Sequence, residues 1–341
     1  MKRAVLIRFS SLGDVVLTLP VTRSLKEAYP AAEIVYLTKA AYRPLLEGQA
    51  GIDRVTTLEE AGPGLAALRR HCRGLGRFDL ALDLHRTLRS RSCLRELHAD
   101  CRLSYRKHAL LRRLWAAGWM RARMAGPQTH VIERYLEPLR RIGVTPAHSV
   151  PEVCVAPGEV EAARALLACA GVRDPGRTAL IVPGARWPNK RWPPASFAAT
   201  AAGLREAEGL EPVIAGDAAD LEAAEAVRAL VPGGAAQLAG RTGLLGLAAL
   251  LRNARVVVAN DSGPAHLAAA VGSPVVAVFG PTHEAFGFSP RGARVRVISR
   301  DLPCRPCTVH GGVRCPLTRR ACLDDIAPAE VLAAARELLR G

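Results

Sequence analysis

The 341-residue sequence is poor in aromatic residues and lacks long apolar runs. Phe, Trp and Tyr make up only 4% of it, which argues against a nucleic-acid binder that stacks bases on aromatic side chains. No stretch of about 18 uncharged apolar residues occurs, so we expect no transmembrane helix. The sequence also lacks internal repeats and low-complexity tracts. What remains is a globular protein whose 49% hydrophobic residues are enough for full cores.

The N-terminal stretch MKRAVLIRFSSLGDVVLTLP lacks the small-residue cleavage site of a signal peptide. Arg8 and Asp14 interrupt its apolar residues, so we expect a first strand and helix here. The nine cysteines are an odd number and follow no secretion signal. They argue against a disulfide framework and predict a reducing cytoplasm.

Acidic residues are scarce relative to basic ones, at 31 against 47, which gives a formal charge of +16 and suggests an anionic partner. Residues 85–125 hold eleven Arg or Lys and two acids, which is +9 of that total. Trp115, Trp119 and Met120 lie among these cations. Such a segment suits anionic lipid headgroups, although an amphipathic helix packed on its own domain would have the same pattern.

Apolar strand-like runs alternate with helical runs along the whole chain, which predicts parallel sheets covered by helices. The segment 143–177 is rich in Gly and Pro and resembles a linker with one short helix, after which the pattern restarts. We therefore predict an α/β fold with two domains, 1–155 and 156–341. The last helix, near 328–340, can pack back on the first domain. Ligands of open α/β sheets bind at the carboxyl ends of strands, so the cleft between the domains is the expected active site.

The loop FSSLGDVVLTLP (9–20) follows the first predicted strand. Gly13 permits a tight turn, and Asp14 enters the first helical turn, where the helix dipole favours a carboxylate. Asp14 can be a simple cap, or a general base that takes a proton from an attacking hydroxyl. The loop has no G-x-G-x-x-G pattern, which counts against a nicotinamide-dependent oxidoreductase.

Two further loops follow strands in the second half. PGARWPNKRWPPASF (183–197) combines Gly184 with Arg186, Lys190 and Arg191, and cations at a strand's carboxyl end suit phosphate recognition. AGDAADLEAAEAV (215–227) supplies carboxylates that can cap a helix or bind ribose hydroxyls, and capping is the more ordinary role.

NDSGPAHLAAAVG (260–272) follows another apolar strand and opens a helix. Ser262 or Gly263 is the expected N-cap, because the proline that follows suits the first turn. Free backbone N–H groups and the positive helix end would then form a site for a diphosphate. His266 can donate to a phosphate oxygen, and Asp261 can orient a neighbour or accept a hydroxyl. A histidine on a helix more often has a structural role. Because Lys190 lies in the loop after another strand and can bind the same phosphate, we favour a binding role for His266.

Four cysteines near the C-terminus follow the spacing C-x2-C-x7-C-x6-C. Four thiolates at this spacing can surround one tetrahedral zinc or iron ion. Such an ion would be structural: it would hold the loop before the final helix in place and would not act on a substrate. Four reduced thiols are the alternative. These residues are Cys304, Cys307, Cys315 and Cys322.

The chain resembles the ADP-heptose:lipopolysaccharide heptosyltransferases of glycosyltransferase family 9. The matching stretches are RFSSLGDVVLTLPVTRSLKEAYP, KRWP, NDSGPAHLAAAVGSPVVAVFGPT and the C-terminal CRPC…CP…CLDDIAPAEV. The region 85–130 carries little that matches. The resemblance implies a GT-B fold, with the acceptor in the N-terminal Rossmann-like domain and the nucleotide-sugar in the C-terminal one, facing a central cleft.

The resemblance also implies an inverting transfer of heptose from ADP-L-glycero-D-manno-heptose to the Kdo- and heptose-bearing inner core of lipopolysaccharide. Asp14 matches the family's catalytic carboxylate, and Lys190 matches the lysine that neutralises the departing diphosphate. The donor-binding loop is matched by Asp261, Ser262, Gly263 and His266, with Gly13 and Gly184 as close-approach positions. No cofactor is required for such catalysis, because cationic side chains and a helix dipole hold the leaving group.

The anionic glycolipid acceptor would give the basic 85–125 segment a role at the inner face of the inner membrane. The details look most like the second heptosyltransferase of the pathway. A family-9 transferase with another core position or a protein as acceptor stays open, as does a non-catalytic nucleotide-sugar-binding protein. Because binding alone would not need both Asp14 and Lys190, we favour the enzyme.

Overall fold

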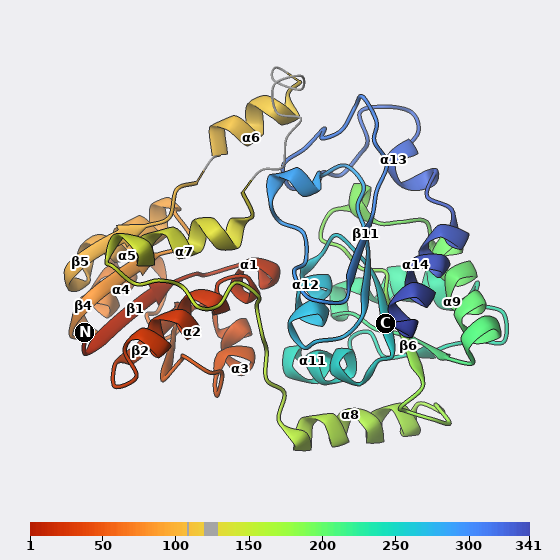
Figure 1. The fold of residues 1–341 in the computed structure, drawn as a ribbon, viewed down its shortest axis with the longest axis horizontal. Coiled ribbons are helices and arrows are strands. Elements are labelled where there is room, and N and C mark those ends of the chain that lie inside the picture. Colours follow the sequence, from red (N-terminus) through yellow and green to blue (C-terminus); the bar gives the residue numbers. More distant parts are fainter. Residues whose placement is uncertain (108, 119–128) are drawn as a thin grey trace. The chain divides into compact units, whose positions relative to one another are not determined.

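The computed structural model describes residues 1–107, 109–118 and 129–341, and the chain divides into two compact units (Figure 1). Unit 1 comprises Met1–Lys107 and Thr129–Cys154. Unit 2 comprises His108–Gln128 and Val155–Gly341. Each unit is built on its own parallel sheet, which confirms the predicted α/β class.

The sheet of unit 1 has five parallel strands in the order β3-β2-β1-β4-β5. Its strands are rich in β-branched and other apolar residues, as fully covered parallel strands must be. The central β1 pairs in register with β2 at Val5 and Val35 and with β4 at Leu6 and Leu82. The strands are β1 (Arg3–Ile7), β2 (Glu33–Thr38), β3 (Arg54–Thr57), β4 (Arg77–Asp83) and β5 (His98–Ser104).

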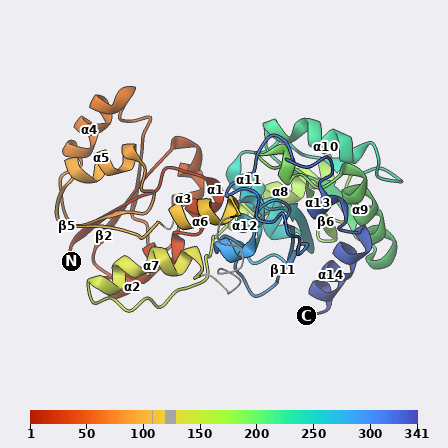
Figure 2. The same cartoon turned by 90° about the horizontal axis from the view of Figure 1, so that it is seen from above.

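Helices cover both faces of this sheet. In Figure 2, α4 and α5 lie on one face and α2 and α7 on the other. Phe78 and Ala81 of β4 pack with Leu68 and Cys72 of α4 in the core of the first of these faces. The helices are α1 (Leu12–Val16), α2 (Leu19–Ala28), α3 (Arg43–Leu46), α4 (Gly64–Gly74), α5 (Leu88–Glu96) and α7 (Val131–Arg141), with a short 3-10 turn, η1 (Ala40–Tyr42).

The sheet of unit 2 has six parallel strands in the order β11-β10-β9-β6-β7-β8. Counted from β6, this is the 3-2-1-4-5-6 order of a dinucleotide-binding sheet, with a reversal between β6 and β9. The strands are β6 (Thr178–Val182), β7 (Glu211–Ile214), β8 (Ala236–Gln237), β9 (Val256–Asn260), β10 (Val275–Val278) and β11 (Val295–Ile298).

One face of this sheet is covered by α9, α10 and α14, whose side chains form a core cluster with Trp192, Phe197 and Leu323. The last helix, α14, packs on α9 and on β9, β10 and β11. The other helices of unit 2 include α8, which packs on α11, and α12, which follows β9. The helices are α6 (Ala109–Ala116), α8 (Pro157–Cys169), α9 (Pro194–Glu208), α10 (Leu221–Arg228), α11 (Leu244–Asn253), α12 (Gly263–Ala270), α13 (Ala321–Asp324) and α14 (Pro328–Arg340), with the 3-10 turns η3 (Pro188–Lys190), η4 (Ala218–Asp220) and η5 (Glu284–Phe286).

The sequence predicted one helix after the first strand, and the structure has two, α1 and α2. Pro20 lies in the first turn of α2, where a missing N–H is tolerated. The described residues of the basic 85–125 segment include α5, the edge strand β5 and α6. Trp119 and Met120, and with them Arg121 and Arg123, lie outside the described residues.

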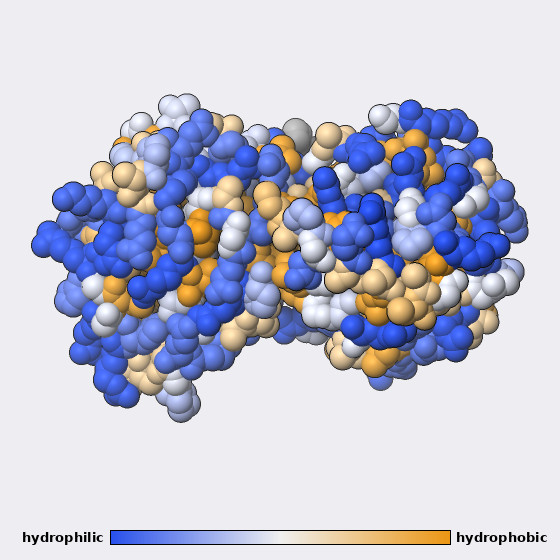
Figure 3. Space-filling model, turned by 90° about the horizontal axis from the view of Figure 1, so that it is seen from below, coloured by the Kyte–Doolittle hydropathy of each residue, from blue (hydrophilic) through white to orange (hydrophobic). Residues whose placement is uncertain are grey.

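Within the described parts of the chain, no helix is both long and apolar enough to cross a membrane. On the face drawn in Figure 3, hydrophilic residues predominate and orange apolar residues occur in smaller groups. This surface agrees with the 23% of charged residues in the sequence.

Candidate active site

The predicted site residues follow strands that flank the point where strand order reverses. Asp14 follows β1 in unit 1, and β1 lies between β2 and β4. Lys190 follows β6 and Asp261 follows β9, and these two strands are neighbours at the reversal in unit 2. The carboxyl ends of parallel strands at such a reversal are where open α/β sheets bind ligands.

Asp14 is held by partners on both carboxylate oxygens. Arg8 Nη2 lies 2.6 Å from Oδ2, which also accepts from Ser11 Oγ at 3.0 Å. The hydroxyl of Tyr135 donates to Oδ1 at 3.2 Å. Ser11 is the N-cap of α1, with Asp14 in its first turn and Gly13 buried beside it. The side chain of Asp14 is 19% exposed, so solvent or a substrate hydroxyl can reach it.

Arg8 fixes this carboxylate and is itself fixed by the backbone. Its Nη1 donates to Leu84 O at 2.5 Å and its Nε to Ser10 O at 2.8 Å. Burial lowers the pKa of Arg8, but the charge of Asp14, together with three neighbouring tyrosines, raises it by more, so the pKa lies above its usual range. Sequence reasoning noted Arg8 only as an interruption of an apolar run, and that interruption was the signal for a buried ion pair.

His85 follows β4 and stacks against Phe9, with 5.3 Å between the ring centroids. Burial, and then the charge of Arg8, lowers the pKa of His85 to about 4, so the imidazole is neutral at ordinary pH. Its Nδ1 is buried without a hydrogen-bond partner among the described residues. Sequence reasoning did not select His85, because a histidine after a strand carries no pattern by itself.

Lys190 and Asp261 form an ion pair in unit 2, with 2.5 Å between Nζ and Oδ2. The two side chains are 12% and 10% exposed, so the pair is largely desolvated. Thr282 Oγ1 donates to the same carboxylate oxygen at 2.6 Å. The sequence placed the first two residues at one site, and the structure brings them into contact. The threonine was not predicted, because it comes from the loop after β10.

Asn260 ties the two loops of this pair together. Its side chain accepts from Trp192 N at 2.9 Å and donates to Pro183 O at 2.7 Å. All three residues are buried. The loop after β6 therefore has one fixed position relative to β9, and Lys190 is held near Asp261 by the backbone as well as by charge.

The first turn of α12 is a candidate anion site. The helix begins at Gly263, with Ser262 as N-cap in an extended conformation and without a side-chain cap. Ser262 Oγ is buried and has no hydrogen-bond partner among the described residues. The free N–H groups and positive dipole of a helix start attract phosphate groups. His266 is buried in this turn, as predicted from its position.

Gly184 allows a close approach of the loops after β6 and β7. A Cβ atom at this position would lie 2.0 Å from Cγ of Asp220. Asp217 caps the turn η4 by accepting from Ala219 N at 2.8 Å, and Asp220 completes a capping box. The capping role predicted for these carboxylates is confirmed.

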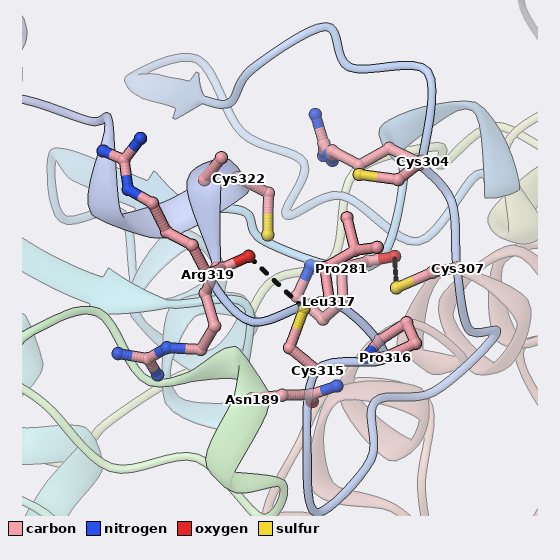
Figure 4. Close-up of a pocket in the computed structure, with 12 residues that line it drawn as sticks. Asn189, Pro281, Cys304, Cys307, Cys315, Pro316, Leu317, Arg319 and Cys322 are labelled. Atoms are coloured by element: carbon pink, nitrogen blue, oxygen red, sulfur yellow. Dashed lines mark hydrogen bonds between the residues drawn. The ribbon is translucent and has the colours of Figure 1, made fainter.

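The four C-terminal cysteines lie together in unit 2, and all are free thiols. They line one cavity of about 30 Å³ with Asn189 and Pro281 (Figure 4). Among the described residues, no three His, Cys, Asp or Glu side chains are placed to hold a metal ion. The predicted ligation by zinc or iron stays a prediction. These thiols belong to Cys304, Cys307, Cys315 and Cys322.

Trp115, which the sequence offered for lipid contact, is only 4% exposed. Its ring packs edge-on against Phe286, with 5.1 Å between centroids, and lies 5.3 Å from the ring of His283. Arg112 stacks over Phe288 beside it. The described part of this helix is therefore an amphipathic helix packed on unit 2, and the use of Trp115 at a lipid surface is wrong because its ring is already buried.

The chemistry of the two groups of residues is complementary. A partly exposed carboxylate with a fixed orientation can accept a proton from a hydroxyl. A lysine and a helix N-terminus can stabilise a phosphate that leaves with negative charge. Asp14 lies in unit 1, and Lys190 and α12 lie in unit 2.

Known proteins with the same sequence features point to one family. The family model described as glycosyltransferase family 9 (heptosyltransferase) matches residues 67–314. Lipopolysaccharide heptosyltransferase 3 of Escherichia coli (strain K12) is 28% identical over 288 residues, which cover 80% of this chain and 81% of that protein. Lipopolysaccharide heptosyltransferase 1 of Pseudomonas aeruginosa is 27% identical, with 89% and 86% covered.

Solved structures show the same fold over the whole chain. A glycosyl transferase of family 9 from Veillonella parvula superposes with a TM-score of 0.82 at 24% identity, covering 99% of this chain and 97% of that one. Escherichia coli ADP-heptose lipopolysaccharide heptosyltransferase II gives a TM-score of 0.76 at 26% identity, with 100% and 99% covered.

Proposed function

This chain belongs to glycosyltransferase family 9, and on that premise we propose that it transfers heptose from ADP-L-glycero-D-manno-heptose to the inner core of lipopolysaccharide. It is a glycosyltransferase with the GT-B fold, and its relatives are named heptosyltransferases. The observation that carries the proposal is the pair of polar centres at the two strand-order reversals, each built on an ion pair: Asp14 with Arg8, and Lys190 with Asp261.

Asp14 is the general base of the proposed reaction. Its carboxylate takes the proton of the acceptor hydroxyl as that oxygen attacks the anomeric carbon of heptose. The bond from the anomeric carbon to the diphosphate oxygen breaks on the opposite side, so the configuration inverts and ADP leaves. Arg8 and Tyr135 keep the carboxylate oriented, which is the support for giving it this role.

Lys190 and the start of α12 receive the negative charge that develops on the diphosphate. The N–H groups after Ser262 and the imidazole of His266 complete the donor site, and Gly184 leaves room for close approach. Asp261 holds Lys190 ready until the donor arrives. Fixed cations and dipoles of this kind do the work of a divalent metal in the transfer step, so we propose no catalytic cofactor.

The acceptor is proposed to be the heptose of the growing core, as for a second heptosyltransferase. The NDSG stretch and the terminal cysteine cluster support this assignment. A family-9 enzyme acting on another core position or on a protein would show the same two centres. A protein that only binds the nucleotide-sugar is disfavoured, because binding does not need the carboxylate of Asp14.

The proposed acceptor is an anionic glycolipid, and we place the enzyme in the cytoplasm at the inner face of the inner membrane. The support is the excess of basic residues, most of it within 85–125. No nucleic acid is expected as a partner. Sedimentation with anionic vesicles, but not with zwitterionic ones, and release by salt would be the expected behaviour.

Transfer in vitro tests the proposed function. The purified chain is incubated with ADP-heptose and a panel of truncated core glycolipids, and the acceptor mass is followed. A gain of one heptose on one acceptor is expected. ADP release without such a gain would indicate hydrolysis or another acceptor, and binding of ADP-heptose without ADP release would favour the binding protein.

Two substitutions separate the roles. Asp14→Ala should abolish transfer and leave ADP affinity within a few-fold, since the carboxylate does not bind the nucleotide.

Lys190→Ala should weaken both donor binding and turnover, by roughly 2–4 kcal/mol of transition-state stabilisation. Loss of ADP binding in the first variant would show a structural role, and an unchanged rate in the second would remove Lys190 from the site.

A further inference from the structure

Four thiols meet in the segment between β11 and α14, outside the centres described above. In Figure 4 their sulfur atoms face the space between them, with Asn189 and Pro281 alongside. The cavity of about 30 Å³ is large enough for a single small ion or water. Its lining also includes the exposed residues Pro316 and Leu317.

Two of the four thiols donate to backbone carbonyl groups. Cys307 Sγ donates to Pro281 O at 3.8 Å, and Cys315 Sγ donates to Arg319 O at 3.6 Å. With these hydrogen bonds in place, the four thiols line one cavity without forming a ligand set among the described residues.

The donor set nevertheless has the chemistry of a closed structural metal site. Four cysteine thiolates around one small cavity suit tetrahedral zinc or iron. Metal binding would replace the two sulfur–carbonyl hydrogen bonds by sulfur–metal bonds and release the thiol protons to solvent. The four thiols match such an ion in donor type and number, and their side chains would have to turn toward one another to hold it.

The cysteine segment holds the loop of Lys190 directly. Asn189 N donates to Gly312 O at 3.2 Å, and Gly312 N donates to Asn189 Oδ1 at 2.8 Å. Asn189 is buried and lines the thiol cavity. On the other side of the lysine, Arg320 Nη1 donates to Arg191 O at 3.0 Å. Both chain neighbours of Lys190 are thus fixed by residues that lie among the cysteines.

The same segment also holds the partner of Lys190. Cys307 N donates to Pro281 O at 3.1 Å, and Arg305 Nη2 donates to Thr282 O at 2.6 Å. Thr282 Oγ1 in turn donates to Asp261 Oδ2. The buried Arg305 therefore links the cysteine segment, through one residue, to the carboxylate of the ion pair.

We propose that Cys304, Cys307, Cys315 and Cys322 bind one zinc or iron ion, and that this ion positions Lys190 and Asp261 by fixing the segment that holds both of their loops. The ion takes no part in the transfer, and the cysteines are positioning residues for the donor site. The positioning of Lys190 and Asp261 for the donor rests on the proposed function, whereas the binding of the metal does not.

Elemental analysis of the full chain, purified under reducing conditions, tests the metal. About one equivalent of zinc or iron is expected, and its identity decides between the two. Cys315→Ser should lower the metal content, whereas Cys169→Ser, at an exposed thiol of α8, should not. Cobalt(II) added to the metal-free protein should give the absorption of a tetrahedral thiolate centre.

Absence of metal, together with no cobalt spectrum, would overturn the site. All nine cysteines titrating as thiols in the unfolded chain would then show a reduced cluster, and a loss of two or four thiols would show one or two disulfides. Because these readouts do not depend on heptose transfer, they remain decisive if the acceptor is another molecule.

ADP affinity, measured by calorimetry, tests the positioning role. Removal of the metal should weaken ADP binding by about tenfold or more, the size of a lost hydrogen bond to a charged group, and added zinc or iron should restore it. Asn189→Ala should weaken ADP binding in the same direction while the metal content stays at one equivalent. In assays, KM for the donor should rise more than kcat falls.

Unchanged ADP affinity after removal of the metal would overturn the positioning role. If Asn189→Ala fails to fold, the comparison of metal-loaded, metal-free and reloaded wild-type protein still decides it.

Discussion

At the scale of single residues, the surroundings of Asp14 combine two roles. The carboxylate completes the N-terminal cap of α1 through Ser11, and the same side chain pairs with Arg8 and accepts from Tyr135. A cap restricts the rotamer of the residue that forms it. Capping therefore does not compete with the proposed role as base, because it fixes the orientation of the carboxylate.

His85 gives a pH prediction at this scale. Its pKa of about 4 in the folded protein lies below the ordinary value of 6.5, so the unfolded chain takes up a proton that the folded chain does not. The contribution of His85 to stability is complete above pH 6.5 and decreases as pH falls from 6.5 toward 4. Urea unfolding across this range should show the decrease.

His85→Gln should reduce that pH dependence, since glutamine does not titrate. His98→Gln, on the exposed end of β5, is the matched control and should leave the slope as in the wild type. A slope unaffected by His85→Gln would mean that other groups cause the acid instability.

At the scale of elements, Gly184 shows how closely two loops approach. Gly184→Ala would place a methyl group 2.0 Å from Cγ of Asp220, whose side chain is held by its hydrogen bond to Asp217 N. We expect a loss of about 1–3 kcal/mol in the free energy of unfolding, as for other overpacked sites, and weaker ADP binding. Gly158→Ala on α8 meets nothing within 4 Å and should change stability by at most about 1 kcal/mol.

The packing of α6 on unit 2 depends on Trp115. Trp115→Ala would remove the ring that contacts Phe286 and His283, and losses of about 3 kcal/mol are typical for a buried tryptophan. Hydrogen exchange should become faster in residues 109–116 and 283–288 and remain unchanged in β1. Trp115→Phe should preserve most of the protection, and equal protection in the alanine variant would show that the ring does not hold the helix.

At the scale of the whole molecule, two sheets with separate cores predict two unfolding events. The core around Phe78 belongs to unit 1 and the core around Trp192 to unit 2. Because ADP is proposed to bind only unit 2, scanning calorimetry should show one transition that rises with ADP concentration and one that does not. At 100 times the Kd, the stabilisation should be about 2.7 kcal/mol. A single transition that shifts as a whole would indicate that the units unfold together.

Much of this arrangement follows from the sequence alone, because the signals are local. Apolar strand-like runs that alternate with helical runs predicted parallel sheets covered by helices, and both units have such a sheet. The first-turn positions of Asp14 and His266 depend only on neighbouring residues, as does the N-cap at Ser262. The sequence also pointed to Lys190 and Asp261, since each lies in a loop directly after an apolar strand.

Contacts between distant segments were decided only by the tertiary structure. The ion pair of Arg8 needs α1 to turn back on β1, and the donor hydroxyl of Tyr135 comes from a helix more than 100 residues away. Thr282 reaches Asp261 only because β10 lies beside β9.

The surroundings of Trp115 and of the four C-terminal cysteines could not be predicted from the sequence, and the cause is the same for both. A ring among arginines has the same sequence pattern whether it meets lipid or protein, and only the fold shows Trp115 against Phe286. Cysteine spacing likewise fixes how far apart thiols can be along the chain. The folded segment alone decides that they share one cavity and that Asn189, from the loop of Lys190, lines it with them.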